Sequence, residues 1–301
     1  MNNELFENYK RDFLSALREA DIHEGDVVYV GSDIAGVIMG AIKELELRGK
    51  AEQNAFLDGI IDTLKTSVGE EGTLLFPVYS WDFCRGKGFD YYKTKGEVGA
   101  FNNYILENRK DFIRTKHPLY SFMVWGKDAA KLAAMDYQEA WGEASIFVYM
   151  HENKAKELDL NVDALRSMTF KHYVEQSVKV PYRYPKFFLG KYTDENGVTE
   201  MRSYSMYVRD LSVEMKSTQT TEFFNNAGVG KTVAFRGWNI NVVYLDQAYD
   251  VIKDCLVNHN GENIYSFENY KIDWNADSAK ERYEVGFLKD RSLAAFPEDL
   301  K

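Results

Sequence analysis

The chain has 301 residues, of which 45% are hydrophobic and 15% aromatic, enough to bury the core of one large α/β domain. Its net charge is −10 and it has no run of Lys or Arg, which disfavours nucleic acid and anionic membranes as partners. The two cysteines have no metal-like spacing, the N-terminus lacks a signal-peptide pattern, and no apolar run approaches a membrane span. We therefore expect a soluble cytoplasmic protein without a metal.

The N-terminal part reads as a β-α-β arrangement. Apolar residues at helical spacing predict helices, and β-branched runs predict buried strands: helices over 4–20, up to residue 45 and over 53–67, and strands over 26–30 and 73–79. This order favours a right-handed parallel crossover. Because sites in open α/β sheets form at the carboxyl ends of strands, residues 31–33 and 80–82 are expected near one rim.

The pattern changes after Pro181. Before it, helices are predicted at 100–107, 127–134 and after 145, with a strand at 122–126 and a polar turn at 115–121. After it, the sequence predicts strands at 187–192, 199–208 and 240–243, a turn at 195–197, and helices at 245–255 and 278–284. We expect a single α/β domain over 1–301, with a mainly parallel N-terminal sheet and a more antiparallel part near 180–260.

The stretch from Thr169 to Gln176 contains one histidine and one glutamate three residues apart, His172 and Glu175. On a helix the two side chains share a face. A carboxylate there can fix the imidazole tautomer and stabilise the imidazolium, which makes a general base. For either residue alone, a structural or surface role is the commoner outcome.

Other motifs in the sequence are weak. Residues 228–232 resemble the end of a phosphate-binding loop, but Asn225 replaces the required first glycine, so a simple turn is the better interpretation. No HExxH or GxSxG motif occurs. Ser32 and Ser121 are therefore predicted to be hydrogen-bond donors rather than nucleophiles, and His117 before Pro118 has a turn role as its default.

Several segments, in order, resemble motifs of the aminoglycoside 3-N-acetyltransferase family. Together the matches extend over roughly residues 20–190. They are the "GTLxxP" strand at 72–77, the "RSxHPxxSxxxxG" segment at 114–126, the "GxxSP" element at 142–146 with Ile146 in place of proline, the "TxxHxxE" element at 169–175 and the "PYR" at 181–183.

This resemblance implies an acyl-CoA-dependent N-acyltransferase with a layered α/β/α fold, distinct from the more common acetyltransferase superfamily. Carried over by position, it makes His172 the base toward the acceptor amine and Glu175 the residue that orients it. Acetyl-CoA or a longer acyl-CoA is expected beside the turn after the first strand and the "RSxHPxxS" segment. The cofactor-side candidates are Ser32, Asp33, Arg114, Thr115, His117 and Ser121.

The acceptor is expected to be an amino sugar. Tyr79, Trp81 and Trp141 are candidates to stack on a sugar or a base, although core positions are the default for aromatic side chains. The Gly31-Ser32-Asp33 turn resembles the branch of the family that acylates nucleotide-linked amino sugars for lipopolysaccharide or another surface glycan. Our preferred acceptor is therefore a dTDP- or UDP-linked deoxyamino sugar. The candidates to bind its diphosphate are Arg85, Lys87, Arg183 and Arg202.

Two alternatives stay open. The first is an aminoglycoside 3-N-acetyltransferase that confers antibiotic resistance, and an acidic cleft would suit its polycationic substrate. The second is a catalytically silent relative that binds CoA or sugar. The sequence leaves the acyl length, the sugar and the oligomeric state open, a homo-oligomer included.

Overall fold

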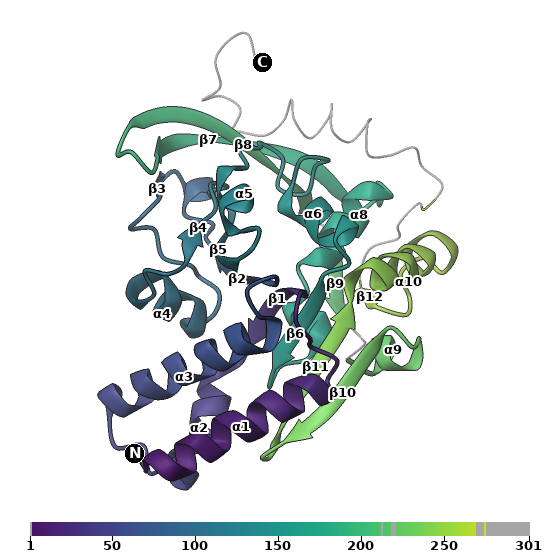
Figure 1. Cartoon of the computed structure of the whole chain (residues 1–301). Helices are drawn as coiled ribbons and strands as arrows, with labels where there is room; N and C mark the ends of the chain where they lie inside the picture. Colours follow the sequence, from purple (N-terminus) through teal and green to yellow (C-terminus); the bar gives the residue numbers. More distant parts are fainter. Residues whose placement is uncertain (1, 212, 218–220, 269–273, 275–301) are drawn as a thin grey trace.

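A seven-stranded mixed sheet forms the centre of the computed structural model, which describes residues 2–211, 213–217, 221–268 and 274 (Figure 1). Its three middle strands are parallel, the next strand on each side runs antiparallel to them, and the two edge strands run antiparallel to their neighbours and so in the direction of the middle strands. The order is β10 (Gly230–Phe235), β11 (Trp238–Tyr244), β6 (Lys156–Leu160), β1 (Val27–Ser32), β2 (Thr73–Tyr79), β5 (Tyr120–Gly126) and β4 (Ile113–Arg114).

Helices cover both faces of the sheet. Alternate strand residues point to opposite faces, and buried apolar residues lie on both. In β1, Val28 and Val30 pack into one core and Tyr29 into the other. The first core contains α1 (Asn3–Glu19), α2 (Ile34–Leu45), α3 (Lys50–Val68) and α4 (Ala100–Asn108). The second contains α5 (Ala129–Ala134), α6 (Ile146–Glu152), α7 (Ala164–Ser167), α8 (Phe170–Ser177), α9 (Thr221–Asn226) and α10 (Leu245–Asn258). The layered α/β/α class is confirmed.

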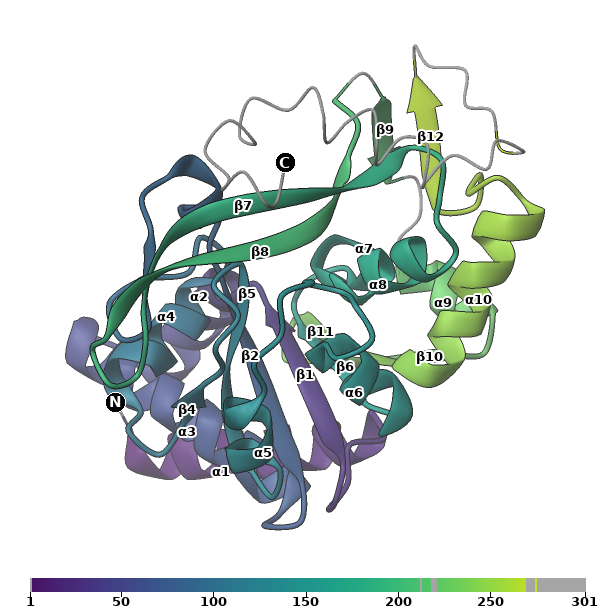
Figure 2. The ribbon, with the colours of Figure 1, turned by 90° about the horizontal axis from the view of Figure 1, so that it is seen from above.

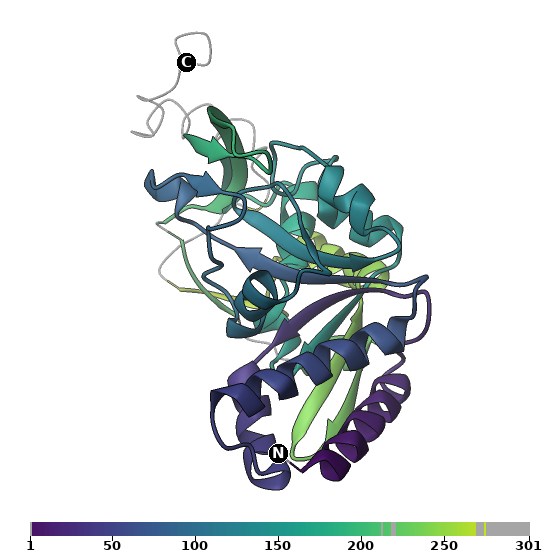
Figure 3. The same cartoon turned by 60° about the vertical axis from the view of Figure 1, so that its left-hand side comes forward.

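A long antiparallel hairpin, β7 (Arg183–Thr193) and β8 (Thr199–Arg209), lies at the end of the molecule remote from α1 (Figures 1 and 3). Figure 2 shows it arching across the molecule above the strands and α8. The short 3-10 turn η1 (Phe83–Arg85) contacts β7, and β3 (Phe89–Asp90) pairs parallel with it. β9 (Glu214–Ser217) pairs with β12 (Tyr265–Glu268). This hairpin is the antiparallel part expected near 180–260.

Most predicted elements coincide with observed ones, with three differences. The predicted turn over 115–121 is shorter, since β5 already begins at Tyr120. Residues 230–232, predicted as part of a simple turn, belong instead to the edge strand β10, which begins at Gly230. The sequence patterns missed several elements, none of them longer than six residues: β3, β4, β9, β10, β12, α7 and α9. The helix predicted at 278–284 lies outside the described residues. No helix in the described part is both long and apolar enough to cross a membrane.

Candidate active site

His172 and Glu175 lie on one face of α8, as their spacing predicts. His172 Nδ1 lies 2.5 Å from Glu175 Oε2. The Glu175 side chain is fully buried, whereas the His172 side chain is 23% exposed. The carboxylate is therefore fixed in the core and the imidazole reaches accessible space.

Three groups hold the Glu175 carboxylate. Besides His172, Arg183 Nε lies 2.8 Å from Oε2, and the Tyr182 hydroxyl donates to Oε1 at 2.8 Å. Burial alone would raise the pKa of Glu175, but Arg183, His172 and Tyr182 outweigh burial and hold that pKa well below its usual range. Glu175 is therefore ionised at neutral pH.

Arg183 is buried in this cluster and was predicted to bind substrate. Its guanidinium pairs with Glu175 and donates from Nη1 to the Tyr207 carbonyl at 3.0 Å. These contacts are internal, and through them Arg183 supports Glu175. The "PYR" segment supplies both further partners of Glu175, Tyr182 and Arg183. Arg183 is the counter-charge that a buried carboxylate needs.

The surroundings keep the His172 ring neutral. Burial, and then the charge of Arg183, lower the pKa of His172 to about 4, although Glu175 acts in the opposite direction. In a neutral ring whose Nδ1–H donates to Glu175, Nε2 carries the free lone pair. This is the protonation state that a general base requires.

A cavity of about 360 Å³ lies at the carboxyl ends of β1 and β2 and is called the inner cavity below. His172 lines it together with three residues predicted for cofactor or substrate, Ser32, Tyr79 and Trp81. The other residues that line it include Gly31, Asn102, Tyr120, Arg166, Ser167 and Thr169. The strand ends thus converge on His172, as expected for an α/β sheet.

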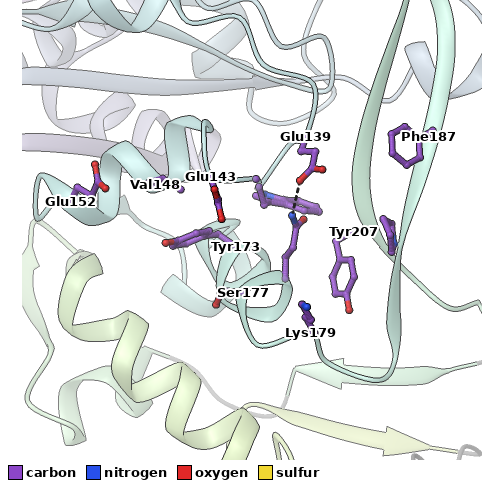
Figure 4. A pocket seen from close by; sticks show the side chains of 13 residues that line it. Glu139, Glu143, Val148, Glu152, Tyr173, Ser177, Lys179, Phe187 and Tyr207 are labelled. Carbon is purple, nitrogen blue, oxygen red and sulfur yellow. Dashed lines mark hydrogen bonds between the residues drawn. The ribbon is translucent and has the colours of Figure 1, made fainter. Parts of the chain in front are cut away.

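A larger groove of about 820 Å³ lies between α6, α8 and the β7–β8 hairpin, and is called the acidic groove below (Figure 4). Glu139, Glu143 and Glu152 line it, with Lys179 as the single Lys or Arg among its lining residues. Figure 4 shows Tyr173 and Ser177 on α8, with Phe187 and Tyr207 on the hairpin.

Trp141 connects the two spaces. It lines the acidic groove, and its ring centroid lies 5.3 Å from that of His172, which lines the inner cavity. Trp141 is buried, and its indole Nε1 has no hydrogen-bond partner among the described residues. Two separate cavities therefore meet at the His172–Trp141 contact, which suits a reaction between two substrates.

Asp33 lies at the start of α2 and does not line the inner cavity. Its carboxylate accepts from Gly36 N and from Asn161 Nδ2, both at 3.2 Å. It lines an adjoining polar hollow of about 490 Å³. That hollow shares Val162 and Arg166 with the inner cavity, so a ligand longer than the inner cavity could extend into it.

The other four cofactor-side candidates lie in the core. Ser121 Oγ donates to the Val78 carbonyl at 2.8 Å and accepts from Arg114 Nε at 3.1 Å. Thr115 Oγ1 accepts from Phe122 N at 2.9 Å. Each of these side chains is buried with an internal partner, and none lines the inner cavity. The contacts give them a structural role at the edge of the sheet.

His117, the fourth, is buried beneath the hairpin. Its Nδ1 accepts from the amides of Leu119 and Tyr120 at 3.3 and 3.2 Å, and its ring stacks on Tyr137. Burial lowers the pKa of His117 to about 3. These contacts fit the turn role that was the default for this residue.

The sequence patterns missed two acidic residues beside the site. Glu157 and Asp159 on β6 are fully buried and face Ser167. The available signal was the alternation of acidic residues with leucine in a strand of the central sheet, where both faces are normally apolar. Among the described residues, no group of three or more His, Cys, Asp and Glu side chains could hold a metal ion.

The chain resembles known acetyltransferases in sequence and in fold. The model of the aminoglycoside 3-N-acetyltransferase family matches residues 44–256, and the chain belongs to this family of N-acyltransferases. A search of curated protein sequences finds no match.

Solved structures show the same fold at low sequence identity. Aminoglycoside acetyltransferase AAC(3)-Xa superposes with a TM-score of 0.65 at 17% identity, covering 81% of this chain and 91% of that one. AAC-IIIb, solved as a binary complex with CoASH, gives 0.65 at 17% identity, with 83% and 96% covered. YokD from Bacillus subtilis gives 0.63 at 19% identity, with 83% and 99% covered.

Proposed function

We propose that this protein transfers an acyl group from acyl-CoA to an amine of a cationic amino sugar, with His172 as general base. The observation that carries the proposal is the His172–Glu175–Arg183 cluster, placed where the inner cavity and the acidic groove meet. A neutral imidazole with a free Nε2, held by a buried carboxylate, is the group that such a transfer requires.

His172 moves one proton in this mechanism. Bound acyl-CoA supplies the thioester carbon that the amine attacks. His172 Nε2 takes a proton from the amine nitrogen as the C–N bond forms, and Glu175 stabilises the imidazolium. The same proton then passes to the sulfur as the C–S bond breaks, which restores neutral His172. No acyl-enzyme is needed.

The inner cavity and the polar hollow are the proposed acyl-CoA site. One structural neighbour is described as a binary complex with CoASH, and the two adjoining spaces share Val162 and Arg166, with His172 in the wall of the inner cavity and mostly polar residues around the hollow. Arg166 lines both spaces and is exposed, so its guanidinium is placed to pair with a phosphate. Ser32, at the end of β1, is a donor in the wall of the inner cavity.

The acidic groove is the proposed acceptor site, and its charge favours a polycation over a nucleotide sugar. Three glutamates and one lysine line it, which suits ammonium groups and disfavours a diphosphate. The basic residues expected to bind a diphosphate are paired with acidic ones instead: Arg85 and Lys87 with Asp82, Arg202 with Glu200, and Arg183 with Glu175. The aminoglycoside-like alternative is therefore the better fit.

A thiol-release assay with acetyl-CoA tests the proposal. We expect turnover with kanamycin-like amines and little with dTDP- or UDP-linked amino sugars. Turnover with the nucleotide sugars alone would overturn the acceptor class. Binding of acetyl-CoA without thiol release in the presence of any amine would favour the catalytically silent relative.

A matched pair of variants tests the groove. Glu143→Gln should raise KM for a polycationic acceptor about three- to tenfold and weaken its salt dependence, because one charge that faces the acceptor is lost. Glu70→Gln removes an equal charge from an exposed position outside the groove and should leave KM unchanged. Equal KM values for the two variants would place the acceptor elsewhere.

A further inference from the structure

Two buried carboxyl groups lie behind the inner cavity and take no part in the mechanism above. Glu157 and Asp159 are alternate residues of β6, beside β1, and both are fully buried. Ser167 Oγ lies 2.5 Å from Asp159 Oδ1 and 3.3 Å from Glu157 Oε1. The other oxygens, Asp159 Oδ2 and Glu157 Oε2, have no hydrogen-bond partner among the described residues.

Gly31 lets Asp159 reach the wall of the inner cavity. A Cβ at residue 31 would lie 2.2 Å from Asp159 Oδ1 and 3.0 Å from Ser167 Cβ. The carboxylate therefore occupies the place of the missing side chain. Gly31 and Ser167 both line the inner cavity, as does His172. A hydroxyl in contact with a buried acid thus shares one cavity with the proposed base.

The Tyr79 hydroxyl, in the wall of the inner cavity, also lacks a partner of good geometry among the described residues. Tyr79 is 3% exposed and lines the inner cavity. Its hydroxyl is adjacent to that of Tyr29, yet it has no partner with hydrogen-bonding geometry among the described residues. Buried hydroxyls are normally paired, so the Tyr79 hydroxyl is available to bond to a group bound in the inner cavity.

The proposed reaction needs a second proton acceptor. An alkyl ammonium must lose one proton to become nucleophilic and another as the amide forms. His172 takes the second and returns it to sulfur. The first proton is held by an ammonium group that is much more basic than His172. Because the pKa of His172 is lowered to about 4, His172 is a poor acceptor for that first proton.

We propose that Ser167 and Asp159 remove the first proton from the acceptor's ammonium group where that group reaches past Trp141 from the acidic groove into the inner cavity beside His172, an inference that rests on the proposed function. The ammonium N–H bond breaks and its proton moves to Ser167 Oγ, while the Ser167 hydroxyl proton moves to Asp159 Oδ1. The amine then attacks the thioester as described above. After product release Asp159 gives its proton to water. The sum is ammonium plus acyl-CoA giving amide, CoASH and one proton.

The carboxyl pair suits this role because its two members cannot both be ionised easily. Burial and the neighbouring carboxyl raise the pKa of Glu157, and burial raises that of Asp159. The Ser167 hydroxyl opposes both shifts. Lys171 also opposes the shift of Glu157, whereas Asp163 acts with burial to raise the pKa of Asp159. With Glu157 holding a proton, Asp159 is the member that exchanges one.

Asp159→Asn keeps the shape of the side chain and removes its basicity. Two acceptors would be compared, a sugar amine that is protonated at pH 7 and the aminooxy analogue of the same sugar, which is not. We expect the variant to lower kcat/KM for the ammonium acceptor at least about tenfold more than for the aminooxy acceptor. The same loss on both acceptors would overturn the proposal.

Two further measurements keep the inference separable from stability and from the proposed function. Glu157→Gln replaces a carboxyl group that holds its proton with a neutral amide, so the acidic limb of the pH–rate profile should stay where it is in the wild type; loss of that limb would show that Glu157 is the member that exchanges the proton, and would count against the relay. Infrared difference spectra should show a buried carboxyl that titrates near neutral pH in the wild type and not in Asp159→Asn. This band is independent of activity, and its absence in the wild type would also overturn the relay. A wild type that acylates no amine yet shows the band would overturn only the proposed function.

Discussion

Arg183 and Glu175 form a buried ion pair, with Nε 2.8 Å from the same carboxylate oxygen that His172 Nδ1 contacts at 2.5 Å. One oxygen thus bridges a permanent cation and an imidazole. The permanent charge keeps Glu175 ionised and disfavours a second positive charge on His172. The ion pair therefore keeps His172 neutral and at the same time lowers its basicity.

His172→Ala should abolish most acyl transfer. Loss of a positioned general base typically lowers the rate by about 10² to 10⁴. The melting temperature should change little, because the side chain is partly exposed. Steady-state thiol release and a thermal melt check this together. An unchanged kcat/KM would remove His172 from the mechanism.

Arg183→Met should destabilise the fold strongly. It leaves the Glu175 carboxylate buried without its cation, a change that typically costs about 3–5 kcal/mol. Arg48→Met is the matched control, since Arg48 is 79% exposed and its ion pair with Glu46 lies at the surface. Urea unfolding at pH 7 measures both, and equal midpoints for the two variants would contradict the role given to Arg183.

The His172–Glu175 pair could be predicted from sequence because it depends on one helix and a spacing of three. The role of Arg183 could not, since the contact with Glu175 requires the chain to leave α8 and enter β7. Likewise the four buried cofactor candidates, such as Ser121, share a motif with the family but face inward. A linear motif does not show which side of a strand faces the ligand.

The fold was predictable where periodicity is strong, as in α1 and β2. It was not where elements are short or paired with distant segments, as for β9 with β12. The pairing of Asp159 with Ser167 across Gly31 belongs to the same class, because the register between β1 and β6 decides it.

His117 should make stability depend on pH. Its folded-state pKa is lowered to about 3 by burial, so the unfolded chain binds a proton first as pH falls below about 6.5. The contribution of neutral His117 to the free energy of unfolding is complete above about pH 6.5 and is lost as the pH falls from about 6.5 to 3. His117→Asn should therefore remove about 1.4 kcal/mol per pH unit from the slope of unfolding free energy in this window.

Urea unfolding at several pH values measures that slope. The raised pKa of Asp159 acts in the opposite direction, so the difference between variant and wild type is the quantity to compare. His259→Asn makes the same replacement at an exposed histidine and is the matched control. A slope that His117→Asn does not alter would show that His117 is not held neutral in the fold.

Gly31→Ala should destabilise the protein and Gly40→Ala should not. At residue 31 a Cβ would lie 2.2 Å from Asp159 Oδ1, so β1 and β6 must shift or the carboxylate must leave Ser167; overpacking of this kind costs about 1–3 kcal/mol. At residue 40, within α2, the nearest atom is Trp238 Cδ1 at 3.7 Å, and alanine is favoured over glycine in a helix by up to about 1 kcal/mol. Urea unfolding of both variants separates close approach from the general effect of replacing glycine. If Gly31→Ala were as stable as Gly40→Ala, the Asp159 carboxylate would not occupy the space above Gly31, and the path from that carboxylate to the inner cavity would be lost with it.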